Sequence, residues 1–102
     1  MPRRDQLEEM LKSSPDDPFL HYALALDDVS AGNADAGIAR LENLIGFAPD
    51  YVAAYFQLGQ LYADAGRTED ARDRLTRGIA VAEKVGDAHA AGEMTGFLAM
   101  LE

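Results

Sequence analysis

The sequence predicts an all-α protein built from repeated pairs of helices, and two observations support this fold class. The first is composition, because the chain includes 18 Ala and 12 Leu but only 10 Val, Ile and Thr together. Ala and Leu favour helices, whereas β-branched residues favour strands. The second is an internal repeat, in which residues 18–51 align with residues 52–85 and are identical to them at seven positions. A repeat of this length is typical of stacked helical pairs.

The first predicted helix spans about residues 3–13 and ends at Ser14, because the residue before a proline disfavours helical backbone. The second spans residues 18–31, where apolar side chains recur at helical spacing. Asp17 is its predicted cap, and the proline that follows suits the first helical position. Gly32 is its predicted stop, since glycine adopts left-handed backbone at low cost.

The remaining helices repeat this plan. They are expected from Asn33 to the residue before Pro49, and over residues 52–65, 69–82 and 88–101. Asn33 and Thr68 are the predicted caps, and Gly66 is the predicted stop in the second copy. Glu83 stands where the first copy has a proline, so the helix over 69–82 is expected to continue to Val85.

The period and its residues resemble the tetratricopeptide repeat. The second copy has the family's aromatic, Leu-Gly and small residues at matching places: Tyr55, Leu58, Gly59, Tyr62, Gly66, Ala71 and Gly78. The first copy matches at Leu24, Ala25, Gly32, Gly37 and Pro49. The resemblance implies one domain, a right-handed α-solenoid of about six helices over residues 1–102. Its expected parts are a lone helix of a partial repeat at 3–14, repeats at 18–51 and 52–85, and a terminal helix at 87–101. Because the chain opens on the second helix of a repeat, we expect it to be part of a longer array.

Asp28 departs from the family pattern, because it stands where the second copy has Tyr62, a position that the family buries. Asp28 is either exposed or buried against an arginine. We favour the exposed position, since an unpaired buried charge is costly. In the last helix, Gly92 and Gly96 are expected to permit close packing against the helix over 69–82.

Charge and composition exclude several classes of partner. With 18 Asp and Glu against 9 Lys and Arg, the net charge is −9, and no basic cluster is present to neutralise a nucleic-acid backbone or an anionic membrane. The sequence has no apolar run of about 18 residues that would span a bilayer, and no visible signal peptide. The lack of cysteine fits a reducing compartment, so we expect a cytoplasmic protein. The acidic surface is either an adaptation to high salt or a solvated bias of composition.

The sequence offers no recognisable catalytic, metal or cofactor site, so no enzymatic activity is expected. His21 aligns with Tyr55 and is interpreted as a helix-packing residue. Asp17 and His21 have i,i+4 spacing, but a metal site needs further ligands. Adjacent acidic residues on a helix point apart, so they do not predict an acid–base pair.

The resemblance implies that the first helix of each pair lines a concave face that binds peptides. Carried over to this sequence, the partner-binding residues are Phe19, Tyr22, Leu26, Val29, Phe56, Gln60, Asp64, Met94 and Phe97. Some relatives hold a peptide's C-terminal carboxylate with Lys, Asn and Arg at positions that here are Tyr22, Ala23, Leu26, Phe56, Gln57 and Gln60. An acidic C-terminal tail is therefore not the expected ligand.

We expect a non-catalytic scaffold that binds an apolar peptide segment or a partner helix in an aromatic groove, with basic flanks that complement the acidic surface. One alternative is a homo-oligomerisation module, in which a second copy covers the apolar residues as a homodimer. Another is a regulatory appendage of an enzyme whose catalytic domain lies outside this chain.

Overall fold

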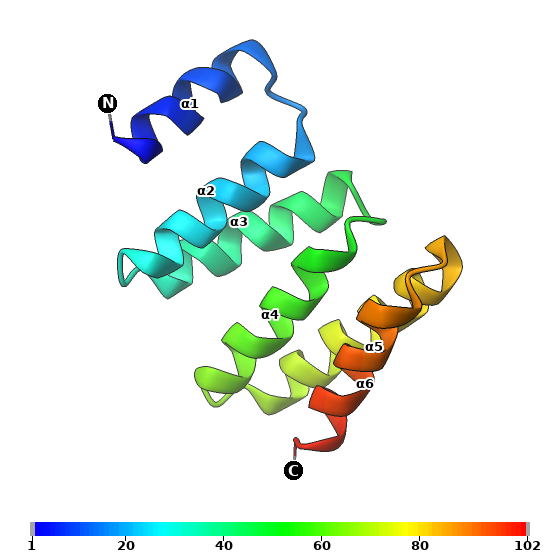
Figure 1. Cartoon of the computed structure of the whole chain (residues 1–102). Helices are drawn as coiled ribbons and strands as arrows, with labels where there is room; N and C mark the ends of the chain where they lie inside the picture. Colours follow the sequence, from blue (N-terminus) through cyan, green and yellow to red (C-terminus); the bar gives the residue numbers. More distant parts are fainter. Residues whose placement is uncertain (1, 102) are drawn as a thin grey trace. The chain divides into compact units, whose positions relative to one another are not determined.

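The computed structural model describes residues 2–101 and confirms the all-α prediction. Within this range the chain forms six helices: α1 (Arg3–Ser13), α2 (Pro18–Ser30), α3 (Ala34–Phe47), α4 (Val52–Asp64), α5 (Thr68–Val85) and α6 (Ala88–Ala99) (Figure 1). No helix among these residues combines the length and the apolar character needed to cross a membrane.

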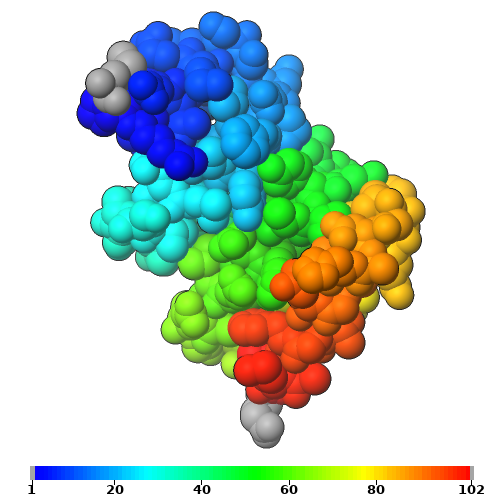
Figure 2. All heavy atoms as spheres, in the orientation of Figure 1, coloured from blue at the N-terminus to red at the C-terminus, as the bar shows by residue number. Residues whose placement is uncertain are grey.

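The chain divides into two compact units, Met1–Ala48 with α1 to α3, and Pro49–Glu102 with α4 to α6. In the first unit, α2 and α3 form a helical hairpin and α1 packs on α2 (Figure 1). In the second unit, α4 and α5 form the hairpin, and α6 packs on α5 and also contacts α4. Figure 2 shows the red atoms of α6 lying directly against the green atoms of α4. Each unit is therefore a hairpin with one additional helix.

The observed helix ends follow the turn residues of the sequence. Gly32, Gly66 and Gly86 all adopt left-handed backbone, with φ of 85°, 77° and 83°. A residue with a Cβ is disfavoured there, which is why glycine stands at each stop. The helix expected over 69–82 does continue to Val85, because Glu83 leaves its backbone N–H available where a proline would not.

The hydrogen bonds and helix bounds confirm one of the three predicted N-terminal caps and correct the other two. The side chain of Asp17 accepts a hydrogen bond of 2.9 Å from the backbone N–H of Phe19, as predicted. Asn33 does stand at the cap position of α3, but its side chain makes no capping hydrogen bond. Thr68 is not the cap of α5: the helix begins at Thr68 itself, and the cap position falls on Arg67, which aligns with Asn33 of the first copy. The register of the repeat therefore decides the cap position, rather than the side chain best suited to capping.

The core of each unit is drawn from all three of its helices; it is aliphatic in the first unit and includes two tyrosines in the second. In the first unit the buried apolar residues are Leu7, Leu20, Ala23, Leu24, Ala25, Ile38, Leu41, Leu44 and Ile45. In the second they are Ala54, Tyr55, Leu58, Leu61, Tyr62, Ala71, Leu75, Ala82 and Met94. These residues recur at helical spacing, which is the pattern from which the helices are predicted.

Close helix packing depends on three glycines, Gly37, Gly59 and Gly78, where an added Cβ would lie 2.6 Å, 2.5 Å and 2.5 Å from a neighbouring side chain. A Cβ added at Gly78 of α5 would lie 2.5 Å from the Cβ of Tyr55 in α4 and 2.7 Å from the Sδ of Met94 in α6. Gly78 therefore lets three helices meet. The expectation for α6 itself is wrong: a Cβ at Gly92 or Gly96 would meet no atom within 4 Å, because both face away from the packed side of α6.

Candidate protein-binding site

In the first unit, α2 presents apolar side chains that the core does not fully cover. Phe19 is 56% exposed, and Tyr22, Leu26 and Val29 are partly exposed. These positions follow helical spacing, so α2 places them toward one side. Val29 also packs inside the unit, because its Cγ2 lies 2.6 Å from the position of a Cβ on Gly37 in α3. Phe19, Tyr22 and Leu26 are therefore the side chains of α2 best placed to contact a partner, and we call them the α2 face.

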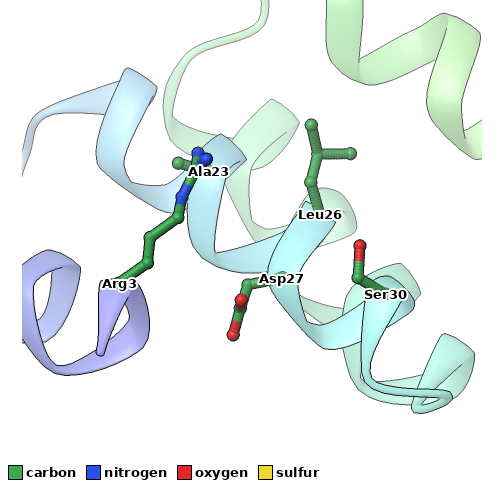
Figure 3. Close-up of a pocket in the computed structure, with 5 residues that line it drawn as sticks. All are labelled: Arg3, Ala23, Leu26, Asp27 and Ser30. Carbon is green, nitrogen blue, oxygen red and sulfur yellow. The ribbon is translucent and has the colours of Figure 1, made fainter.

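A hollow of about 350 Å³ lies beside the α2 face (Figure 3). Arg3 extends toward it from α1, and α2 lines it with Ala23, Leu26, Asp27 and Ser30. In Figure 3, Leu26 and Ser30 point to the same side of α2, and Asp27 points to the other. The hollow combines an apolar wall with a guanidinium, a carboxylate and a hydroxyl group, so it has room for one side chain of a partner.

In the second unit, α4 and α6 bring two aromatic side chains together. The rings of Phe56 and Phe97 lie edge to face, with centroids 6.0 Å apart and planes at 64°. Both side chains remain partly exposed, as does Gln60 one turn beyond Phe56, and Asp64 is exposed. Edge-to-face geometry is the favourable arrangement for an aromatic pair. The pair, with Gln60, forms what we call the α4–α6 face.

Met94 is a correction to the predicted site, because its side chain is 0% exposed. Its Sδ lies 2.7 Å from the position that a Cβ on Gly78 of α5 would occupy. The reason is that α6 packs on α5 through the gap that this glycine leaves. Met94 supports the core of the second unit and does not contact a partner directly.

Asp28 is the second correction, because the side chain expected to be exposed is buried, with 7% of the residue accessible. The guanidinium of Arg4 in α1 donates to Asp28 Oδ1 at 2.5 Å, and the Nε of Arg40 in α3 donates to Oδ2 at 3.2 Å. Arg4 also contacts Asp27 at 3.3 Å and Glu8 at 3.5 Å. The buried charge is therefore paired, which removes the penalty on which the prediction of exposure rests.

The electrostatics of this cluster follow from its geometry. Burial by itself raises the pKa of the Asp28 carboxyl, but the hydrogen bonds and charges of Arg4 and Arg40 outweigh burial and hold that pKa below its ordinary value. The hydrogen bond to Asp28 is also the main reason that the pKa of Arg4 is raised. Asp28 is therefore a structural carboxylate that stays ionised at neutral pH.

The two histidines have different surroundings. His21 hydrogen-bonds through Nε2 to the carbonyl of Pro15 at 2.7 Å, and its ring meets Phe47 edge to face with centroids 4.9 Å apart. Tyr55, its counterpart in the second copy, donates from its hydroxyl to the carbonyl of Pro49 at 2.7 Å. The shared geometry agrees with a packing role for His21. His89 is exposed and lies 3.2 Å from Glu93.

The part of the chain from residue 2 to residue 101 contains no group of three or more His, Cys, Asp or Glu side chains that could hold a metal ion. Within the same part, every buried side-chain nitrogen or oxygen has a hydrogen-bond partner. The two apolar faces and the ion pairs of Asp28 with Arg4 and Arg40 are therefore the candidate functional features. Nothing in the local sequence around Asp28 indicates its pairing, because Arg4 and Arg40 lie 24 and 12 residues away.

Helical hairpins that recur at the period of the sequence repeat, with small residues at the helix contacts, define a helical-repeat protein. The sequence profile of the Tetratricopeptide repeat family matches residues 28–92, and the chain belongs to this family. A TPR repeat-containing protein of Pseudomonas aeruginosa is 33% identical over 96 residues, which cover 94% of this chain and 91% of that protein.

Solved structures agree with the family assignment. A tetratricopeptide repeat domain protein from Salinibacter ruber, solved in solution, matches with a TM-score of 0.79 and 39% identity, over 82% of this chain and 85% of that one. A protein from Bordetella parapertussis matches with a TM-score of 0.81 and 28% identity, over 96% of this chain and 85% of that one. Tetratricopeptide repeat proteins generally act as protein-interaction modules and are typically non-catalytic.

Proposed function

We propose that this chain is a non-catalytic protein-binding module that holds an apolar segment or helix of a partner protein on its half-exposed aromatic side chains. The observation that carries the proposal is the edge-to-face pair of Phe56 and Phe97, both of which remain partly exposed. Aromatic side chains that neighbouring contacts hold in place contribute strongly to protein interfaces, because they bury a large area and lose little conformational entropy on binding.

The α2 face supports the same function from the first unit. Phe19 is 56% exposed and lies on the same side of α2 as the partly exposed Tyr22 and Leu26, so apolar side chains gather there. Leu26 borders the hollow in Figure 3, so a side chain of a partner has space beside it. With repeats at 18–51 and 52–85, as the sequence predicts, the residues of the α2 face and Phe56 belong to the first helix of a pair, on which the resemblance places peptide binding.

The charge pattern specifies the flanks of the partner segment. Eight of the nine Lys and Arg side chains already form ion pairs with acidic side chains. The net charge is nevertheless −9, so the excess charge on the chain is acidic. Complementary charge speeds association and disfavours wrong partners. We therefore expect an apolar core with Lys or Arg flanks to bind more tightly than the same core with acidic flanks.

The test is a binding titration by fluorescence anisotropy. The probe is a fluorescein-labelled amphipathic peptide of about 15 residues, or about four helical turns, with an apolar core and Lys flanks. The comparison peptides keep the length but carry Glu flanks or a polar core. The wild-type chain is expected to bind the Lys-flanked peptide most tightly. Equal binding of the polar-core peptide would refute an apolar binding face.

The binding faces are tested by the double variant Tyr22→Ala, Phe56→Ala, which removes one aromatic side chain from each face. Loss of one aromatic contact from each face should weaken peptide binding by about tenfold or more, while helicity by circular dichroism stays nearly unchanged. Met10→Ala is the matched control, because Met10 is 53% exposed but lies on α1, outside both faces. Unaltered binding by the double variant would place the site elsewhere on the chain.

Homo-oligomerisation is the alternative that these apolar faces leave open. Sedimentation velocity over a dilution series distinguishes the two functions. A monomer at every concentration leaves the faces available to a foreign partner. A dimer that resists dilution and is broken by the double variant would replace the proposal with self-assembly. The other alternative is a regulatory appendage of an enzyme whose catalytic domain lies outside this chain. In that case too, this chain would act by binding protein and not by catalysis.

A further inference from the structure

Helix α1 contacts the rest of its unit through one side only. Arg4, Leu7 and Leu11 lie at positions i, i+3 and i+7, which align on one face of a helix. Leu7 is buried, Leu11 and Arg4 are partly buried, and the other eight of the eleven residues are exposed. The docking of α1 therefore depends on one arginine and two leucines.

The surface beneath α1 is complementary to those three side chains. Leu7 joins a buried cluster with Leu20, Ala23 and Leu24 of α2, and Leu11 packs against the same cluster. At its edge stands the buried carboxylate of Asp28, which receives Arg4. We call this surface the α1 seat. It consists of the apolar residues of α2 and the buried carboxylate of Asp28. A helix with a neutral side chain in place of Arg4 would leave Asp28 without one of its two arginine partners.

The second unit shows that the repeat does not require an acidic residue at this position. Tyr62 is the counterpart of Asp28 in the second copy, and the guanidinium groups of Arg67 and Arg74 lie over its ring at 4.5 Å and 5.6 Å. Arg74 is the counterpart of Arg40. Both units therefore place an arginine of the second helix beside this position. Only the first unit has a carboxylate there, and that carboxylate accepts a second arginine from α1.

The helix in the seat has few other supports. It has 11 residues, and no side chain caps its N-terminus. Helices of this length are marginal in water unless tertiary packing holds them. Beyond Ser13, the residues Ser14 to Asp17 link it to α2 without helical structure. Undocking α1 therefore breaks no helix at the linker; it exposes the apolar cluster of α2 and leaves Asp28 with Arg40 as its arginine partner.

We propose that the α1 seat is a docking site for a partner-protein helix that carries an arginine followed by leucines three and seven residues later, and that α1 occupies this seat in the free chain. The partner competes with α1. Asp28 selects arginine because a guanidinium stays charged and is weakly hydrated when it is partly buried beside a carboxylate, as the Nη1 of Arg4 is beside Asp28 and Asp27. The seat lies under α1 and is separate from the α4–α6 face, so the proposal goes beyond the apolar-segment binding proposed above and does not depend on it.

The test uses the full chain with α1 loosened and the seat intact. The variant Leu7→Ala, Leu11→Ala removes the apolar contacts of α1 without altering α2 or α3. The probe is a fluorescein-labelled helical peptide on an Ala, Glu and Lys background, with Arg, Leu and Leu at the spacing of α1. Its analogue replaces the arginine by glutamine. The control is a pair of peptides with the sequence of residues 2–14, one natural and one with glutamine in place of Arg3. Arg3 makes no ion pair among the described residues.

Competition predicts that the loosened chain binds the Arg-Leu-Leu peptide about tenfold more tightly than the wild-type chain. The glutamine analogue should bind the loosened chain about tenfold more weakly, because a hydrogen bond to a buried charge is lost. Adding Asp28→Asn to the loosened chain should abolish the difference between the two peptides. The two control peptides, with Arg3 or with glutamine in its place, should bind the loosened chain with equal affinity. Hydrogen exchange must show that α1 has lost protection while α4 to α6 keep theirs.

Three outcomes would overturn the proposal. Equal binding of the arginine peptide and its glutamine analogue would mean that Asp28 does not select the partner. No binding by a loosened chain with an unprotected α1 would mean that the seat accepts no helix in trans. A concentration-dependent dimer of the wild-type chain that the Leu7→Ala, Leu11→Ala variant no longer forms would assign the seat to α1 of a second copy instead.

Discussion

Replacing Gly78 by alanine tests the packing that supports the α4–α6 face. The new Cβ would lie 2.5 Å from the Cβ and 3.2 Å from the Cγ of Tyr55, and 2.7 Å from the Sδ of Met94. The Cβ of Tyr55 is attached to the backbone and cannot rotate away, and its hydroxyl is held by the carbonyl of Pro49. The change must therefore push α4, α5 and α6 apart, since packed cores have little free space.

The magnitude is the sum of two opposing effects. Alanine favours a helix interior over glycine by about 1 kcal/mol. Inserting a methyl group into a tightly packed core destabilises by about 1–3 kcal/mol. The matched control is Gly92→Ala, where the new Cβ meets no atom within 4 Å, so only the helix-propensity gain remains. The Gly78→Ala variant should thus be less stable than the Gly92→Ala variant by about 1–3 kcal/mol, with the propensity effect cancelled.

The assay is chemical denaturation followed by the far-ultraviolet circular dichroism signal of helices, on both variants and the wild type. Gly92→Ala is expected to raise the free energy of unfolding above the wild-type value, and Gly78→Ala to lower it. In thermal unfolding, the difference corresponds to a Tm gap of several degrees, at about 4–8 °C for each kcal/mol in a domain of this size. If Gly78→Ala were as stable as Gly92→Ala, the close approach of the three helices at residue 78 would be refuted.

Three further predictions concern individual side chains. Met94→Ala should destabilise the fold by about 2–5 kcal/mol in the same denaturation assay, because Met94 is fully buried; a loss of peptide binding with unchanged stability would restore it to the binding site. Because the pKa of Asp28 is lowered in the folded chain, its contribution to stability is present above the unfolded pKa of about 3.9 and is lost as the pH falls below that value. The free energy of unfolding should therefore fall less steeply from pH 6 to pH 2 in the Asp28→Asn variant than in the wild type. An identical slope in both would contradict the pairing of Asp28 with arginine. Tyr55→Phe should cost about 1 kcal/mol through the lost hydrogen bond to Pro49, and a neutral effect would mean that water replaces it.

The helices and their ends can be predicted from the sequence because local residues determine them. Glycines at the stops and Asp17 at a helix start act within one turn of the chain, and the repeat period aligns one copy with the next. The continuation of α5 to Val85 follows from the absence of a proline at Glu83. Each of these features requires only the chemistry of neighbouring residues.

The errors concern contacts between helices. The sequence alone favours an exposed Asp28 because its arginine partners are distant along the chain, and local spacing carries no signal of them. The resemblance places Met94 on the binding face, and periodicity does not correct this, because α6 is apolar or small on nearly every side. The same ambiguity misassigns Gly92 and Gly96, whereas Gly78, in the preceding helix, provides the close contact.

The central claim is that the half-exposed aromatic side chains bind a segment of another protein. The most direct measurement is a nuclear magnetic resonance titration of the isotope-labelled chain with the Lys-flanked apolar peptide. We predict that the largest shifts and contacts fall on Phe56, Phe97 and Leu26, and that Met10 and the exposed side of α5 stay unchanged. Contacts confined to α5, or no change at peptide concentrations that saturate the anisotropy signal, would contradict the account.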